Sequence, residues 1–384
     1  MKVKLGEICG YVKGKTLVSE LTDKTYISTE NMLPNKMGIT LASSLPTSEQ
    51  TQIYRIKDVL VSNIRPYFKK IWQAEWDGGC SADVLVFRAK EGIFQDYLYF
   101  VLSDNRFFEY SMATSKGTKM PRGDKTSIMQ YEVELPSYDE QVKIASVLSD
   151  IETKIKLNNE INSNLFEQAN ALFYNYVIVP SNFEKSGTLG DYCDVKSGYA
   201  FKSAWWTTSG VKVIKIKTIE NDALNLNECS YVSPDKSDYA KDFSVVAGDV
   251  LIAMTGATIG KFAIVPYLDE EILVNQRVGR FFLGDNPIEK LPFLYCSLKQ
   301  NDIIADIINK GQGSAQPNIS GNDILTTPCY LPATNEIDEF NQLCKPYFET
   351  ILRNQRQNIE LSNIRDTLLP KLMSGVIDLS NIGI

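Results

Sequence analysis

A short cationic loop is the part of the sequence whose residue types suggest chemistry most directly. The segment SKGTKMPRGDK, residues 115–125, carries four Lys or Arg side chains against a single Asp, a local net charge of +3. Cations gathered in this way neutralise phosphates, and the affinity that they give falls as salt rises. The polar residues that we expect to contact nucleic acid in this loop are Lys116, Thr118, Lys119, Arg122 and Lys125.

A second, nearly uncharged loop lies later in the chain, in the segment NKGQGSAQPNIS at residues 309–320. Gln and Asn amides can bind an adenine edge through two hydrogen bonds. Glycine lets the backbone come close to a DNA groove. Pro121 in the first loop and Pro317 in the second stiffen their loops, so less conformational entropy is lost when the loop binds. The candidates here are Gln312, Ser314, Gln316 and Asn318.

Two further sets of candidates lie in and after the strand-like segments that begin at Asp58 and Asp249. Any one of these side chains is more often ordinary surface or part of a turn than a DNA contact. As sets at duplicated positions they indicate a binding surface, although polar loops also bind proteins. The first set is Asn63, Arg65, Tyr67, Lys69 and Lys70, and the second is Thr255, Thr258, Lys261, Asn275, Gln276 and Arg277.

The candidates recur because the chain contains two copies of one plan. KLGEIC at 4–9 matches TLGDYC at 188–193, and DVLVSNIRPYFKKI from Asp58 matches DVLIAMTGATIGKF from Asp249. In both copies the loop precedes a Leu-Pro pair. The offset between the copies grows from 184 to 191 to 196 residues, as insertions in loops would produce. We predict that each copy is a mixed domain, a curved sheet with a few helices.

After each Leu-Pro pair the apolar periodicity changes from two to about 3.5, which is typical of a coiled-coil seam. Most amphipathic helices pack onto their own domain, but these stripes are long and duplicated. We predict two long helices that pair as an antiparallel coiled coil about a pseudo-twofold axis. Buried asparagines in the seam would fix its register at the expense of stability. The expected pairs are Asn158 with Asn358 and Asn162 with Asn354.

Proline complicates the second helix. Pro346 lacks an N–H and clashes with the preceding helical turn, so we expect the regular part of that helix to begin near Lys345.

Several classes of enzyme are disfavoured. The chain has no histidine, so His general bases, Ser-His-Asp arrangements and His-ligated metals are excluded. GKT at 14–16 and GATIGK at 256–261 resemble phosphate-binding loops, but Cys9 and Thr255 stand where the first glycine is needed. DNPI at 285–288 lacks the second proline and the aromatic residue of an amino-methyltransferase signature.

Composition is that of a folded protein of two or three domains, with 43% hydrophobic and 23% charged residues over 384 positions. No membrane span or secretory signal is evident, so we predict a cytoplasmic protein. The seven cysteines are spread without a CxxC pair, which argues against disulfides and zinc. The net charge of -7 does not favour nucleic acid, but residues 1–137 alone are slightly basic.

Two phrases carry a resemblance to a known family. LPSYDEQVKIASVLSDIETKIKLNNEIN leads the first helix, and LLPKLMSGVI closes the second. With NQRVGRF and GSAQPNIS in the second copy, they make the chain resemble the specificity subunit of type I restriction-modification enzymes over almost its whole length.

The resemblance implies a subunit that performs no chemistry and binds no cofactor itself. Two target-recognition domains would each read half of a split sequence in double-stranded DNA, and the helices would set the unread gap. Two methylation subunits would dock on the helices and bring S-adenosylmethionine, while restriction subunits would add ATP hydrolysis and cleavage in phage defence. A helix of about 33 residues spans roughly 50 Å, enough for modules one duplex turn apart, about 34–36 Å.

The predicted fold is therefore α+β, with recognition domains at 1–137 and 181–333, a spacer helix at 138–180, and a second helix with a tail at 334–384. Two other functions remain open at this point. A coiled-coil adaptor that binds proteins through its repeated domains would show binding insensitive to salt. A self-sufficient enzyme acting on DNA would transfer methyl groups without partners.

Overall fold

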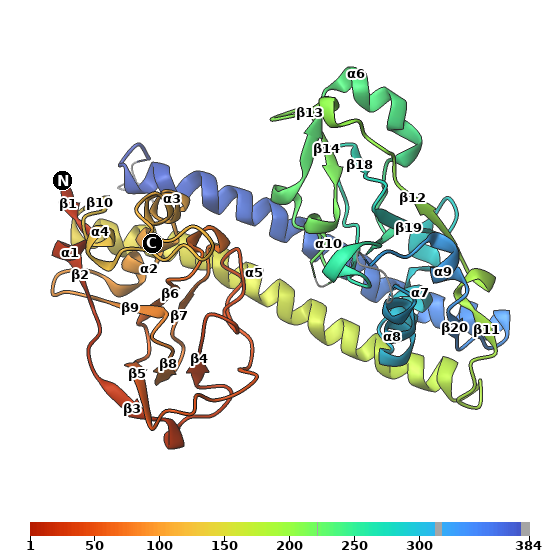
Figure 1. The fold of residues 1–384 in the computed structure, drawn as a ribbon, viewed down its shortest axis with the longest axis horizontal. Coiled ribbons are helices and arrows are strands. Elements are labelled where there is room, and N and C mark those ends of the chain that lie inside the picture. Colours follow the sequence, from red (N-terminus) through yellow and green to blue (C-terminus); the bar gives the residue numbers. More distant parts are fainter. Residues whose placement is uncertain (221, 312–316, 378–384) are drawn as a thin grey trace. The chain divides into compact units, whose positions relative to one another are not determined.

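A computed structural model of the chain describes residues 1–220, 222–311 and 317–377. The chain divides into two compact units, each made of sequence-distant pieces. The first unit is Met1–Lys154 with Leu361–Ile384, and the second is Ile155–Glu360. Each unit thus contains one sequence copy and part of both long helices (Figure 1).

In the first unit an antiparallel sheet has the order β2-β9-β6-β7, and a second sheet has the order β3-β5-β8-β4. The first sheet consists of β2 (Cys9–Tyr11), β9 (Val84–Ala89), β6 (Val59–Ser62) and β7 (Ile71–Gln73). The second consists of β3 (Lys15–Leu17), β5 (Gln50–Tyr54), β8 (Gly78–Cys80) and β4 (Tyr26–Ile27), and a ribbon pairs β1 (Lys2–Lys4) with β10 (Glu132–Glu134). The short helices are α1 (Leu5–Ile8), α2 (Gln95–Ser103), α3 (Asn105–Ala113) and α4 (Lys125–Ile128).

The second unit repeats this plan, with the sheet orders β12-β19-β16-β17 and β13-β15-β14-β18. Its first sheet consists of β12 (Asp194–Ser197), β19 (Val278–Phe282), β16 (Val250–Ala253) and β17 (Phe262–Ile264). The second consists of β13 (Trp206–Thr207), β15 (Ser230–Val232), β14 (Val211–Ile214) and β18 (Ile272–Val274), and a ribbon pairs β11 (Gly187–Thr188) with β20 (Pro328–Cys329). The short helices are α6 (Pro234–Ser237), α7 (Leu291–Leu298), α8 (Asn301–Lys310) and α9 (Gly321–Leu325).

The strands β6 and β16 are buried on both faces, and all their residues are apolar except Ser62. Successive side chains of a strand point to opposite faces. In β6, Val59 and Val61 pack in the core beneath the helices, whereas Leu60 packs in the core shared with the second sheet. Val250 and Leu251 of β16 divide in the same way between two cores of the second unit. The cores therefore lie on the two sides of the central sheet.

The copies differ in how their second sheets are completed. A parallel pair is common to both, β4 with β8 and β14 with β18. In the first unit an antiparallel strand, β5, joins this pair at β8. In the second unit the antiparallel strand β15 joins the pair at β14. The duplication therefore extends to the central sheet and helices more faithfully than to the second sheet.

The long helices are α5 (Tyr138–Phe173), followed by a π-helical turn at Tyr174–Ile178, and α10 (Thr334–Met373). Within the second unit, Asn158 Nδ2 donates to Asn358 Oδ1 at 2.9 Å, and Asn354 Nδ2 donates to Asn162 Oδ1 at 2.9 Å. The helices are therefore antiparallel there, and the hydrogen bonds join the residue pairs expected from the seam. That the pairing is a coiled coil, and that these residues fix its register, stay predictions.

The expected start of the second helix near Lys345 is wrong, because α10 begins at Thr334 and runs through Pro346. Ile337, Phe340 and Cys344, upstream of the proline, are buried in the core of the second unit. Burial of these apolar side chains outweighs the local cost of proline in the helix.

The Asn158 pair yields a prediction about stability. Asn158 is fully buried, and its Oδ1 has no hydrogen-bond partner, which is unfavourable. Changing both Asn158 and Asn358 to Ile should raise the free energy of unfolding on the order of 1 kcal/mol while loosening register. Asn158→Ile alone should lower it, because Asn358 would keep a polar group without this partner. Thermal unfolding of both variants checks this, and a large loss in the double variant would contradict it.

Across the described ranges, no helix is both long and apolar enough to cross a membrane. All seven cysteines are free, and all except Cys193 are buried.

Candidate nucleic-acid interface

The structure brings the two candidate segments of the first unit together. After β6, Ile64 forms an antiparallel bridge with Arg122 of the cationic loop. Two backbone hydrogen bonds flank this bridge, from Arg65 N to the Pro121 carbonyl at 2.8 Å and from Gly123 N to the Asn63 carbonyl at 3.2 Å. Residues 63–65 and 121–123 therefore form one platform, which we call the first loop platform.

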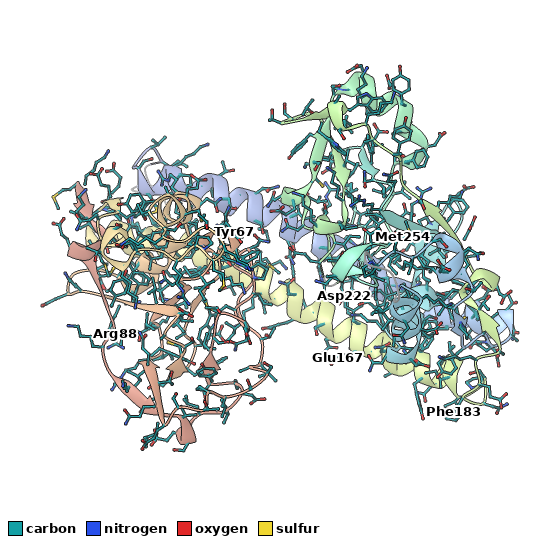
Figure 2. All side chains as sticks on the ribbon, in the orientation of Figure 1. Tyr67, Arg88, Glu167, Phe183, Asp222 and Met254 are labelled. Carbon is teal, nitrogen blue, oxygen red and sulfur yellow. The ribbon has the colours of Figure 1, made fainter. Side chains whose placement is uncertain are left out.

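The second unit has the same construction, the second loop platform, formed by residues 254–256 and 317–319. Thr255 bridges Asn318. Gly256 N donates to the Pro317 carbonyl at 2.9 Å, and Ile319 N donates to the Met254 carbonyl at 2.9 Å. These two hydrogen bonds form the Thr255–Asn318 bridge, and they are the equivalents of the two in the first unit at the sequence offsets of 191 and 196. Met254, the buried residue before the bridge, is labelled in Figure 2.

The cations of the loop at 115–125 are not equally available. Lys116 Nζ lies 2.5 Å from Asp124, and Arg122 pairs with Asp83 at 3.2 Å. The hydrogen bond from Lys116, with that from the Ser127 N–H, lowers the pKa of Asp124 to about 2, so this carboxylate is charged at neutral pH. Lys119 and Lys125 are exposed and form no ion pair within the described part of the chain. They are the cations best placed to meet phosphate.

The other first-unit candidates divide between surface and interior. Asn63 is only 8% exposed, whereas Tyr67, labelled in Figure 2, is 48% exposed. The rings of Tyr67 and Phe68 lie with their centroids 4.7 Å apart. Lys70 donates to the Thr29 carbonyl at 2.6 Å, and burial lowers its pKa. Tyr67 is therefore accessible to a ligand, while Lys70 is engaged inside the protein.

In the second unit the candidates nearest the platform include both amides and a cation. Asn318, Gln276 and Arg277 are exposed, and the Arg277 carbonyl accepts a hydrogen bond from Met254 N at 3.1 Å. Thr258 Oγ1 is already used, because it donates to the Thr255 carbonyl at 3.2 Å. Lys261 is exposed and Asn275 half-buried. Gln312, Ser314 and Gln316 lie outside the described residues.

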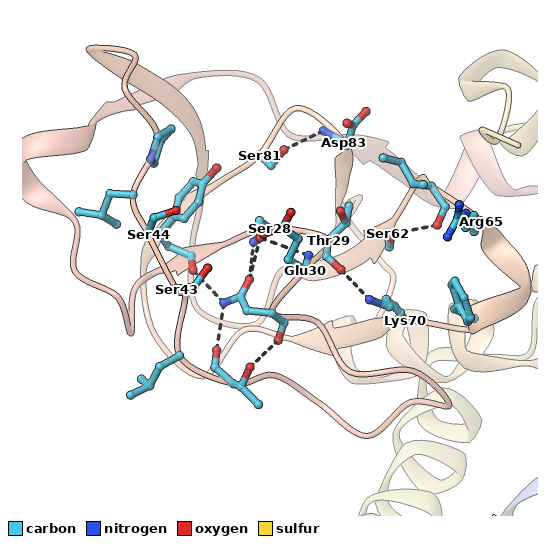
Figure 3. Close-up of a pocket in the computed structure, with 18 of the residues that line it drawn as sticks. Ser28, Thr29, Glu30, Ser43, Ser44, Ser62, Arg65, Lys70, Ser81 and Asp83 are labelled. Atoms are coloured by element: carbon cyan, nitrogen blue, oxygen red, sulfur yellow. Dashed lines mark hydrogen bonds between the residues drawn. The ribbon is translucent and has the colours of Figure 1, made fainter. Parts of the chain in front are cut away.

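A pocket of about 750 Å³ opens beside the first loop platform. Ser62, Arg65 and Met120 lie on its platform side, and Figure 3 shows Arg65 at one end of it, beyond Ser62 and Lys70. The rest of the wall comes from loops around residues 26–31 and 40–46, with Ser81 and Asp83. Those loops were not among the sequence candidates. Their only local signal was the small, polar run LASSLPTS at 41–48.

Sequence reasoning also missed a group of cations and aromatic rings in the second unit. Lys215 Nζ lies 3.3 Å from the centroid of Trp206, and Lys236 Nζ lies 5.9 Å from that of Trp205. Tyr239 beside them is 64% exposed. Interleaved Lys and aromatic residues over 199–243 are the signal that could have found this group. Over the described residues, no cluster of His, Cys, Asp or Glu could hold a metal ion.

Comparison with known proteins shows which family has this arrangement of domains and helices. The model of the type I restriction modification DNA specificity domain matches residues 1–166 and 180–361, which together make up most of the chain. The chain belongs to this family. It is a specificity subunit with two recognition domains, which confirms the resemblance seen in the two helix phrases. From here on, the domains that carry the first and second loop platforms are called the first and second recognition domains.

Specificity subunits from other organisms are similar to this chain over nearly its full length. The chain is 24% identical to the type I restriction enzyme MjaVIII specificity subunit of Methanocaldococcus jannaschii, covering 99% of this chain and 93% of that one. It is 21% identical to the HindI specificity subunit of Haemophilus influenzae, with 97% and 98% covered. The crystal structure of a type I system S subunit from M. genitalium has a TM-score of 0.51 at 17% identity, covering 97% and 96%. This likeness confirms the predicted fold class, two repeated mixed domains with long helices. The predicted domain boundaries stay predictions.

Proposed function

We propose that the two recognition domains each read one half of a split sequence in double-stranded DNA. The observation that carries this proposal is the pair of loop platforms, which share an antiparallel bridge made by two equivalent backbone hydrogen bonds but present different side chains. A common scaffold with different polar groups suits two readers of different half-sites. The first platform has the exposed Lys119 and Lys125 nearby, and the second presents Asn318, with Gln276 and Arg277 nearby.

The same proposal gives the chain a recognition role without catalysis. Two methylation subunits supply S-adenosylmethionine chemistry, restriction subunits supply ATP hydrolysis and cleavage, and this chain orients them on DNA. The family and the named specificity subunits among its relatives support this division of labour. The long helices set the unread gap in this proposal. No membrane takes part.

Salt dependence tests whether DNA is the ligand of the first platform. Changing Lys119 and Lys125 together to Ala should lower affinity and reduce the slope of log K against log salt by about 1.8, because each lost phosphate contact contributes about 0.9. The measurement is DNA binding by the complex with methylation subunits at several salt concentrations.

A matched control removes the same formal charge elsewhere in the first recognition domain. Lys2 and Lys4 on β1 pair with Glu134 and Glu132, at 3.7 and 2.9 Å. Changing both to Ala should leave the slope nearly unchanged. Salt-independent binding by the wild-type complex, or no DNA binding at all, would instead favour an adaptor that binds proteins.

A further inference from the structure

Three left-handed backbone positions recur in the two recognition domains, and the copies fill them differently. In the first domain the three positions hold basic residues, with φ angles of 72°, 50° and 51° in chain order. In the second domain, 191 residues later, all three are glycine, with φ angles of 90°, 72° and 84°. The equivalent positions are Lys57 with Gly248, Arg65 with Gly256, and Lys69 with Gly260.

A side chain in this conformation is unfavourable, because its Cβ crowds the backbone. An ion pair within the fold offsets the strain at Lys57, since its Nζ lies 3.0 Å from Asp96. The Lys69 carbonyl accepts a hydrogen bond from Lys36 N at 3.0 Å, but this bond involves only the backbone, and a glycine could form it. Arg65, like Lys69, has no ion pair or side-chain hydrogen bond within the described part of the chain, and of these two residues only Arg65 lines the pocket beside the first loop platform. The fold alone therefore does not explain why arginine stands at position 65.

The backbone of Arg65 is held firmly. Its N–H donates to the Pro121 carbonyl of the cationic loop at 2.8 Å, and Pro66 follows it directly. Its Nε is shielded from water and lacks an acceptor, an unusual state for a buried polar group. The side chain lines the 750 Å³ pocket beside the first loop platform (Figure 3). The site thus presents an unneutralised guanidinium from a fixed position.

A fixed arginine suits a base better than a phosphate. The guanidinium fork fits O6 and N7 of guanine, the commonest specific contact between a side chain and a base in the major groove. Exposed lysines such as Lys119 can reach phosphate without backbone strain, so phosphate binding gives no reason to keep the strain. Strain that persists beside a functional surface is typical of pre-organised sites.

We propose that Arg65 is a specificity-determining residue of the first recognition domain that reads a guanine in its half-site. Gly256 leaves the equivalent position of the second domain without such a reader. This inference rests on the proposed function, since it assumes that the first loop platform faces DNA.

The test is a selection from random duplexes by the complex of this chain with its methylation subunits, for wild type and variants. Arg65→Gly should lose the preference for guanine at one position of the first half-site. It should bind the wild-type site about 10- to 100-fold more weakly, the range for one lost bidentate contact. Its melting temperature should hold or rise, because glycine relieves the backbone. Arg65→Lys should weaken the same preference while keeping the salt slope, because an ammonium group keeps the charge but lacks the planar fork.

Two matched variants complete the design. Lys57→Gly also relieves a left-handed position but lies before β6, so it should leave the selected motif unchanged. Gly256→Arg should create a guanine preference in the second half-site. A Cβ there meets nothing within 4 Å, so the variant carries backbone strain of the kind that Arg65 carries but no clash.

The outcomes separate this inference from the proposed function. A split motif whose guanine preference survives Arg65→Gly would overturn the inference alone. A uniform loss of affinity across sequences with a shallower salt slope would also overturn it, since that result identifies a phosphate contact. A wild-type complex that selects no split motif would overturn both.

Discussion

Replacing Asp366 with alanine is expected to lower the free energy of unfolding of the first unit by about 3 kcal/mol, because it leaves a buried lysine without its partner. Lys36 Nζ lies 3.3 Å from Asp366 Oδ1, and the lysine side chain is only 4% exposed. Burial, with the neighbouring Arg365 charge, lowers the pKa of Lys36 to about 8 even beside this carboxylate.

Asp366 also belongs to a wider charge network. Arg365 Nε donates to Asp366 at 2.9 Å, and Arg365 Nη1 donates to Glu152 of α5 at 2.8 Å. The network ties the end of α10 to α5 and to the loop at Lys36 within the first unit. Loss of Asp366 should therefore unfold residues 1–154 sooner, although the change is made far away in sequence.

Denaturant unfolding followed by tryptophan fluorescence, with hydrogen exchange to locate the change in residues 1–154, checks this expectation. Asp150→Ala is the matched control, since Asp150 is exposed on α5 and forms no ion pair in the described part of the chain. Adding Lys36→Met to Asp366→Ala should recover much of the loss, because the uncompensated charge disappears. A loss of less than about 1 kcal/mol, the range of exposed pairs, would contradict the account.

Replacing Phe348 with alanine is expected to destabilise the second unit by about 3–5 kcal/mol, the cost of a cavity in a packed core. Phe348 is fully buried in α10. Its ring centroid lies 5.3 Å from that of Tyr295 in α7 and 5.9 Å from that of Phe166 in α5. Phe166 and Tyr295 stack at 4.5 Å, so three elements meet at one cluster of rings.

The matched control for this prediction is Leu343→Ala on the same helix, because Leu343 is 41% exposed. It should cost much less than Phe348→Ala. The measurement is the free energy of unfolding by chemical denaturation, with hydrogen exchange over α5, α7 and α10 to locate the change. Equal effects of the two substitutions would mean that this part of α10 is not integral to the core of the second unit.

Much of the architecture could be predicted because it repeats. The equivalence of Asp58 with Asp249 and of Pro121 with Pro317 located both loop platforms. The seam period placed Asn158 opposite Asn358. Such features depend on local pattern and on comparison of the chain with itself, which a single sequence contains.

The remaining features depend on contacts between segments distant in sequence. Phe348 in α10 is fully buried against Phe166 and Tyr295, and the period of the helix alone does not show these contacts. Lys36 and Asp366 lie 330 residues apart, and no local pattern joins them. Periodicity cannot report such contacts, since it records only neighbours along one element.

The candidate site shows the same limit. From the sequence alone, Lys116 and Arg122 were expected to be available to phosphate, but each has an acidic partner in the fold. Asp124 and Asp83 neutralise them, and only the fold shows that Asp83 comes close to Arg122. Left-handed backbone at Arg65 was equally invisible, because arginine rarely adopts it.

A selection from random duplexes shows whether the two recognition domains read a split sequence in DNA. The wild-type chain, assembled with its methylation subunits, is expected to select two short motifs separated by a gap of constant length. Selection of one continuous motif, or of no motif under conditions where DNA is bound, would contradict this expectation.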